Sequence, residues 1–349
     1  MALHFHAHAQ MPQAAAFMAW LQDHLQAEGV HVQRTPTGLQ MHMPQVGMLA
    51  FHTLTEHGFA CDIAANDGRM AALIQLALDE HAQEFLHDHG ERPTALQLRW
   101  SGLPAADLQH RFQVARVIAV HDLTPHMRRV RLAAPVMAPW LGDGLHVRLV
   151  LPPQGQTWQW PHINLQGRLQ WPPEHPPLPQ RIYTIRARDA QAAWVEVDIV
   201  RHDHAAPGAC WIAQVQPGDT VGLLGPAGGS LPDSDALLLV ADMAALPAAL
   251  RIAQAQSLRG GTWQLLALGT HASDCDYVPA SAQVHWHIGP VPSQAAAVDA
   301  WLRTQCLSMP TPPSLWLAGN HTLVQDLRAA LQAAPIDALA QCKLATYWQ

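Results

Sequence analysis

Arg181-Ile182-Tyr183-Thr184-Ile185-Arg186 decides the fold, together with Pro207-Gly208-Ala209-Cys210-Trp211 further along the chain. The first stretch reads as a strand with two arginines and two hydroxyl side chains, and the second as a small-residue turn into a helix. Guanidinium groups pair with phosphate oxygens through their fork geometry, and N–H groups at a helix N-terminus hold anions. The two stretches therefore predict a site for the diphosphate of a flavin dinucleotide, FAD.

Short strands separated by Pro and Gly surround this motif on both sides. They cover residues 112–120, 127–132, 146–151, 194–201 and 220–224. Many short strands with little helix are typical of a closed or nearly closed barrel. We therefore expect an antiparallel β-barrel FAD-binding domain over residues 108–234.

The pattern changes after the barrel, over residues 235–349. Apolar runs at 236–241, 263–268 and 315–318 alternate with helical stretches at 246–256, 295–302 and 323–333. Buried strands alternating with helices predict a doubly wound parallel sheet, which binds ligands at the carboxyl ends of its strands. We expect this α/β domain to bind a nicotinamide nucleotide.

Residues 1–100 form a first unit of a different kind. Helical spacing covers 12–28 and 67–89, and short strands cover 3–9, 30–33, 39–43, 48–54 and 58–63. This is the pattern of a small α+β module. The fold class is therefore multidomain, with residues 101–107 as a linker.

Composition excludes several classes of protein. The 349 residues are 49% hydrophobic and 13% charged, with a net charge of -7 and one lysine, so nucleic acid is not an expected partner. Neither a signal peptide nor an apolar run of membrane-spanning length is visible, and we expect a cytoplasmic protein without a membrane span. The five cysteines form no Cys-x-x-Cys pair, which favours reduced thiols.

The ordered set of motifs resembles the siderophore-interacting proteins, FAD-dependent ferric-siderophore reductases of the ferredoxin reductase superfamily. The matching segments are 181–186, 197–202, 207–211, 217–219, 225–228, 241–248 and 347–348. They span residues 110–349 in the order of the family. Residues 1–97 resemble a small accessory domain that accompanies some members.

The resemblance implies a role for each matched residue. For FAD these residues are Arg181 and Arg186 on the diphosphate, Tyr183 and Thr184 on the isoalloxazine, then Asp198, Val200, His202, Gly208, Ala209, Cys210 and Trp211. For the nicotinamide they are Asp242, Leu246 and Pro247. Arg148 and Lys343 would receive an anionic iron chelate, although isolated surface cations are more often simply solvated.

Three positions depart from the family pattern. Ala209 replaces a usual serine, Ala244 a usual threonine, and Asn320 a common glutamate. Two hydroxyls that would contact the nucleotides are therefore missing. Residues 269–283 contain Asp274 and Asp276 but no Arg or Lys, and since a 2'-phosphate attracts cations, this favours NADH over NADPH.

The expected reaction passes hydride from NAD(P)H to FAD and single electrons from the flavin to Fe(III) in a siderophore or similar chelate, and it needs no catalytic nucleophile or base. Two alternatives remain open. One is a flavin oxidoreductase acting on a non-iron acceptor, and the other is a flavin-free siderophore-binding protein, suggested by Ala209 and Ala244.

Histidine is abundant, with 23 residues in the chain. His4, His6 and His8 share one face of a predicted strand, as do His285 and His287. Neutral imidazole binds transition metals, but no further ligands can be identified from spacing. A polar strand face is the favoured interpretation, and no metal site is predicted.

Overall fold

A computed structural model describes residues 2–27, 30–43, 46–66, 68–92, 95–102, 112–137, 144–153, 158–163, 169–173, 176–201, 206–225, 229, 231–309 and 311–348. The chain forms two compact units. The first comprises Met1–Phe112, Gln159–Pro176 and Gly225–Ala227, and the second comprises Gln113–Trp158, Pro177–Leu224 and Gly228–Gln349.

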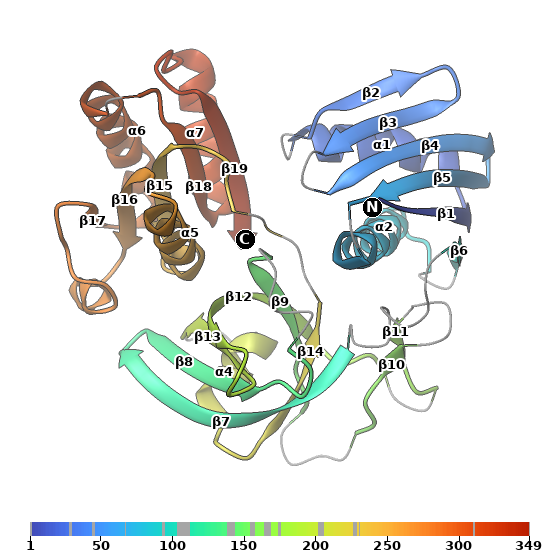
Figure 1. The fold of residues 1–349 in the computed structure, drawn as a ribbon, viewed down its shortest axis with the longest axis horizontal. Coiled ribbons are helices and arrows are strands. Elements are labelled where there is room, and N and C mark those ends of the chain that lie inside the picture. Colours follow the sequence, from blue (N-terminus) through green and yellow to red (C-terminus); the bar gives the residue numbers. More distant parts are fainter. Residues whose placement is uncertain are drawn as a thin grey trace. The chain divides into compact units, whose positions relative to one another are not determined.

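The first unit is built on a six-stranded antiparallel sheet in the order β2-β3-β4-β5-β1-β6 (Figure 1). Its strands are β1 (Leu3–Gln10), β2 (Val32–Thr35), β3 (Gly38–Met43), β4 (Gly47–Thr55), β5 (Gly58–Ala65) and β6 (Gln97–Ser101). Its helices are α1 (Ala14–Ala27) and α2 (Gly68–Asp88), and it also holds the short strands β10 (His162–Ile163) and β11 (Leu169–Gln170).

One face of this sheet packs against the two helices. Phe5, Ala7 and Ala9 of β1 are buried, and Phe17 of α1 and Phe85 of α2 join them in one core. The alternate residues His4, His6 and His8 are exposed, as the period of a strand requires. The predicted α+β module is confirmed, but β6 was not predicted.

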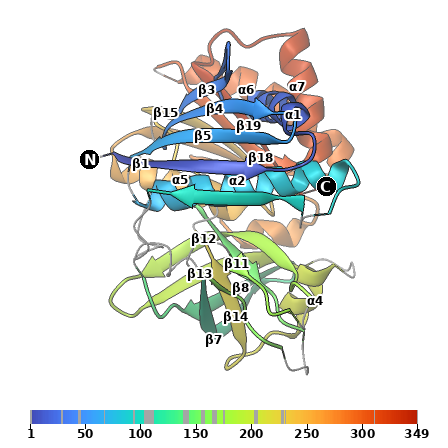
Figure 2. The same cartoon turned by 90° about the vertical axis from the view of Figure 1, so that its right-hand side faces the viewer.

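The second unit contains a closed barrel in the strand order β12-β13-β8-β7-β14-β9. Figure 2 shows several of these strands curving around a common centre. The bounds are β7 (Phe112–Thr124), β8 (Met127–Ala133), β9 (His146–Val150), β12 (Gln180–Asp189), β13 (Trp194–Val200) and β14 (Thr220–Leu224). The predicted barrel is confirmed, and the opening motif lies on β12.

Closure of the barrel brings together segments that are distant in sequence. Strand β12 pairs with β9 on one side, with Tyr183 opposite Val147, and with β13 on the other. Helix α4 (Pro207–Gln214) turns Trp211 and Ile212 into the barrel core.

The remainder of the second unit is a parallel sheet in the order β17-β16-β15-β18-β19. The strands are β15 (Ala236–Asp242), β16 (Thr262–Gly269), β17 (Val284–Ile288), β18 (Ser314–Asn320) and β19 (Gln341–Trp348). The helices are α5 (Leu246–Leu258), α6 (Val291–Ser308) and α7 (His321–Ala333), with a short 3-10 helix at Ala272–Asp276.

Helices cover both faces of this sheet, which explains its continuously apolar strands. Leu237 and Leu239 of β15 pack with α5, whereas Leu238 and Val240 pack with α6 and α7. The predicted doubly wound sheet is confirmed. Its strand order reverses between β15 and β18, and their carboxyl ends are where such sheets bind ligands.

Two further expectations concern the chain as a whole. All five cysteines are free thiols, as predicted. Among the described residues, no helix is both long enough and apolar enough to cross a membrane.

Candidate functional site

The motif strand β12 lies against the first turn of helix α4. A Cβ atom added to Gly208 would lie 2.5 Å from the Tyr183 hydroxyl and 3.6 Å from Cγ of Arg181. Only glycine permits this approach, since real Cβ atoms are not found so close to another heavy atom. The two segments that were predicted to bind the same diphosphate, 181–186 and 207–211, are therefore adjacent in space.

The N-terminus of α4 is suited to hold an anion. Its N-cap is Ala206, which has no side chain to accept from the first N–H groups, and proline occupies the first turn. The first N–H groups of a helix have no partner within it, and the helix dipole adds partial positive charge there. With the exposed Arg181 alongside, this end of α4 combines backbone donors with a guanidinium.

Arg186 supplies a second guanidinium from the same strand. Its Nε atom is buried and finds no hydrogen-bond acceptor among the described residues. A buried donor without an acceptor costs free energy, so this nitrogen is available to an acceptor that the described residues do not provide.

Thr184 begins a chain of hydrogen bonds that reaches the parallel sheet. Its Oγ1 atom lies 3.5 Å from Nδ1 of His146, and Nε2 of His146 lies 3.0 Å from the Tyr347 hydroxyl. Burial, together with the positive charges of Arg251 and Lys343, lowers the pKa of His146 to about 4. His146 is therefore neutral at pH 7 and can bridge the two hydroxyls.

Tyr183 is also kept neutral by its surroundings. Burial raises its pKa to about 12, although the nearby Arg181 opposes this shift. Burial likewise raises the pKa of Tyr347, and the carboxylate of Asp242 adds to the effect. Each phenol can therefore donate a hydrogen bond at neutral pH.

Asp242 ends β15 at the point where the strand order reverses. It accepts from Trp348 Nε1 at 2.7 Å and from the backbone N–H groups of Ala244 and Ala245 at 3.0 and 3.1 Å. Burial raises its pKa, and these donors oppose the increase. Asp242 thus shapes the turn that leads into Leu246 and Pro247, the first residues of α5.

Asn320 lies at the end of β18, beside this turn. Its Oδ1 atom accepts from the N–H of Leu323 at 2.8 Å and caps α7. Its Nδ2 atom is buried without a hydrogen-bond partner in the described part of the chain. Asn320 therefore offers a buried donor at the carboxyl ends of β15 and β18, where such sheets bind ligands.

Helix α5 connects the turn after Asp242 to the motif strand. Nη1 of Arg251 donates to the carbonyl oxygen of Ile185 at 3.0 Å and to that of Leu145 at 3.2 Å. Because α5 follows the Asp242 turn directly, the predicted nicotinamide loop and the predicted flavin strand belong to one connected network.

Asp198 makes its hydrogen bonds within the protein. Arg129 binds its carboxylate with two N–H groups at 2.7 and 2.8 Å, and the Tyr277 hydroxyl donates to it at 2.5 Å. The pairing of β13 with β8 sets Asp198 directly opposite Arg129. Its contact with the cofactor stays a prediction.

The other predicted residues are placed as follows. Val200 ends β13 and is half-buried, Cys210 is exposed, Ala209 is half-buried, and Trp211 is buried in the barrel core. His202 lies outside the described residues. Arg148 lies two residues after His146 on β9, and the charge of Lys343 acts on His146.

Three residues that hydrogen-bond to the predicted strands of the site were not predicted from the sequence: His146, Arg129 and Arg251. Each acts through a partner that is distant in sequence, and only strand pairing or helix docking brings the partners together. Tyr347 and Trp348 were noted as part of a motif, but their bonds to His146 and Asp242 carried no sequence signal.

The residues present fit a flavin dinucleotide. Arg181, the N-terminus of α4 and the buried Nε of Arg186 supply donors for a diphosphate, and Gly208 lets the Tyr183 hydroxyl lie against the first turn of α4. Tyr183 and Thr184 of the same strand would meet the isoalloxazine. This donor set matches what phosphate oxygens require.

The barrel and the parallel sheet each match the sequence model of a known family. The sequence model of the siderophore-interacting FAD-binding domain matches residues 116–230, and that of the siderophore-interacting protein matches residues 234–349. Among solved structures, the siderophore-interacting protein SipS from Aeromonas hydrophila superposes with a TM-score of 0.54 at 25% identity, covering 68% of this chain and 91% of SipS.

Curated relatives include iron reductases. Ferric vibriobactin reductase ViuB of Vibrio cholerae is 32% identical over 108 residues, which are 30% of this chain and only 39% of the relative. The NADPH-dependent ferric-chelate reductase of Escherichia coli is 26% identical over 247 residues, which are 68% of this chain and 93% of the relative.

Proposed function

Residues 116–349 belong to the siderophore-interacting protein family, and on this basis we propose that the protein uses NAD(P)H and FAD to reduce Fe(III) held in a siderophore or similar chelate. The observation that carries the proposal is the convergence of Arg181, Tyr183 and Gly208, with the buried Nε of Arg186 on the same strand. Bound FAD would accept two electrons as hydride and deliver them one at a time.

The chain's own residues have defined tasks in this proposal. Arg181, Arg186 and the N-terminus of α4 bind the diphosphate, and Tyr183 and Thr184 orient the flavin ring. The turn between Asp242 and Leu246 receives the nicotinamide, with the Nδ2 atom of Asn320 as a further donor. No side chain has to act as a nucleophile.

Arg148 and Lys343 are proposed to attract the chelate, because ferric chelates with acidic ligands carry negative charge. One NAD(P)H would reduce two Fe(III) ions to Fe(II) and release NAD(P)+ and one proton. Fe(II) is held less tightly than Fe(III) by hard oxygen ligands, so reduction would release the metal. Since NAD(P)H is the donor, we place the reaction in the cytoplasm.

A steady-state assay tests this function. We expect NAD(P)H oxidation by the FAD-loaded protein to depend on a ferric siderophore and to form two Fe(II) per NAD(P)H. Turnover with quinones but not with any ferric chelate would instead favour a flavin oxidoreductase with a non-iron acceptor. Running both nucleotides in parallel tests the predicted preference for NADH.

Substitutions at two neighbouring residues test the proposed diphosphate site, and they should change the FAD affinity in opposite directions. Gly208→Ala should weaken FAD binding by roughly 1 to 3 kcal/mol, because the new methyl group displaces the Tyr183 ring. Ala209→Ser should instead tighten binding by about 0.5 to 1.5 kcal/mol through one added hydrogen bond. Titration of each apoprotein with FAD gives both values. Equal affinities for the two variants would place the diphosphate elsewhere.

A further inference from the structure

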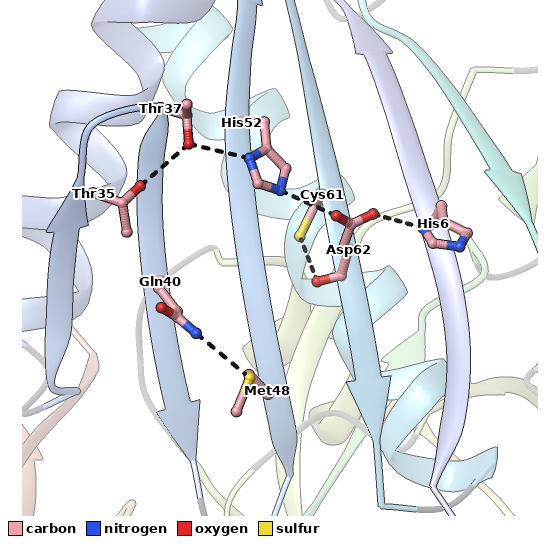
Figure 3. Close-up of polar contacts among 8 residues, drawn as sticks. All are labelled: His6, Thr35, Thr37, Gln40, Met48, His52, Cys61 and Asp62. Atoms are coloured by element: carbon pink, nitrogen blue, oxygen red, sulfur yellow. Dashed lines mark hydrogen bonds and ion pairs between the residues drawn. The ribbon is translucent and has the colours of Figure 1, made fainter.

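Histidine meets carboxylate in several clusters outside the flavin site, and most of these contacts are ordinary hydrogen bonds. On the exposed face of the first unit's sheet, Asp62 lies 2.6 Å from His6 Nδ1 and 3.1 Å from His52 Nε2 (Figure 3). These contacts hold the pKa of Asp62 below its usual value. Both carboxylate oxygens are thus already engaged by imidazole.

A second cluster, around Asp274, also consists of ordinary hydrogen bonds. Asp274 Oδ1 lies 3.0 Å from His126 Nδ1, and its Oδ2 accepts from the backbone N–H groups of Thr270 and His271, each at 3.0 Å. The carboxylate therefore fixes the loop after β16, and its oxygen atoms already have donors.

The third cluster has a different geometry. One ligand atom from each of His24, His81 and Glu84 lies within 4.8 Å of the other two. The distance from His81 Nδ1 to Glu84 Oε2 is 4.0 Å, too long for a hydrogen bond. Zinc binds nitrogen and oxygen ligands at about 2.0 to 2.2 Å, so two tetrahedral ligand atoms lie roughly 3.4 Å apart. The cluster is therefore near the spacing of a metal site.

Helix packing sets this spacing. His81 and Glu84 are one turn apart on α2, where residues three apart share a face. His24 comes from α1, and its ring lies 4.9 Å from that of His81. Trp20, one turn earlier on α1, stacks on His24 with ring centroids 4.7 Å apart. The aromatic core thus orients one imidazole toward the other.

The surroundings suit an ion that keeps one position open. The side chain of His81 is only 21% exposed, whereas that of Glu84 is 53% exposed. The core side of the cluster is apolar, since Phe85 next to Glu84 is buried. Metal–ligand attraction is stronger at such an edge than in open water, and a water molecule can reach the fourth position.

We propose that His24, His81 and Glu84 bind one divalent first-row transition-metal ion, with zinc(II) as the representative case. Two imidazoles and one carboxylate are a ligand set that such ions favour, and the single negative charge of Glu84 partly neutralises the ion. The site belongs to the first unit and does not depend on the proposed reductase activity.

Zinc retention by the full-length protein tests the proposal. Metal-free protein is dialysed against zinc(II) buffered by a chelator of moderate affinity, and bound zinc is measured by mass spectrometry. The wild type should retain one zinc per chain. Glu84→Gln changes a half-exposed side chain and should fold normally, yet it should bind zinc at least tenfold more weakly. His81→Asn and His24→Asn should behave in the same way.

Two matched controls separate this site from general histidine binding. His87→Ala removes an exposed imidazole from the same helix, and Asp62→Asn alters the sheet cluster; both should retain one zinc. The proposal fails if the wild type retains no zinc or if Glu84→Gln retains it unchanged. It also fails if the loss follows Asp62→Asn.

Discussion

Replacing both Arg181 and Arg186 with alanine should abolish stable FAD binding. Each charge-assisted hydrogen bond to phosphate contributes about 1.5 to 3 kcal/mol, so loss of both should raise the Kd roughly 100-fold or more. The Nε of Arg186 is buried and has no acceptor in the described part of the chain, so this position should be the more sensitive of the two. Flavin absorbance after gel filtration of the FAD-loaded variant measures the loss.

Arg259→Ala is the matched control for this experiment. Arg259 lies at the end of α5 and donates to the carbonyl oxygen of Pro232 at 3.3 Å, so its loss should leave the flavin bound. If the double variant retains flavin as the control does, the assignment of the diphosphate site is wrong.

Acidification from pH 8 to pH 5 should cost the protein about 2 kcal/mol of stability through His146 alone. The pKa of this imidazole falls from 6.5 to about 4 on folding, chiefly because of burial. Below pH 6.5 this imidazole is therefore protonated in the unfolded chain, whereas in the folded protein it stays neutral until the pH approaches 4. The contribution is fully present above pH 6.5 and is lost progressively as the pH falls toward 4.

His146→Gln tests this pH dependence, because glutamine can hydrogen-bond Thr184 and Tyr347 but does not titrate. Urea unfolding at the two pH values should show a smaller loss of stability in this variant than in the wild type. His121→Gln, at an exposed position on β7, should retain the wild-type difference. Equal pH dependence in all three proteins would show that His146 already accepts a proton in the folded state.

Local sequence patterns predict most of the helices and strands of the fold. The strand containing Arg181 and Arg186, the apolar run 236–241 and the helical spacing over 246–256 each predict an element that the structure contains. Strand β19 was not predicted, because eight residues at a sheet edge show neither a long apolar run nor regular alternation. Strand β6 does alternate polar and apolar residues over Gln97–Ser101, a short signal that was not used to predict it.

The sequence was enough to predict that two separate segments meet in space, but it did not predict many of the side-chain contacts around them. Tyr183 and Gly208 lie on separate elements, and the chemistry of a diphosphate was enough to associate them. The contacts of Thr184 with His146 and of Asp198 with Arg129 depend instead on the register of the closed barrel, which places those strands side by side. Sequence periodicity predicts on which face of a sheet a side chain lies, but it does not predict which residue of the neighbouring strand lies beside it.

Rapid mixing of the reduced, FAD-loaded protein with a ferric siderophore under anaerobic conditions tests the central claim most directly. Flavin absorbance should return as two Fe(III) are consumed and two Fe(II) appear for each FAD, with the Arg148→Ala variant responding more slowly. If the flavin stays reduced in the presence of ferric chelates but is reoxidised by a quinone, the protein is not a ferric-chelate reductase.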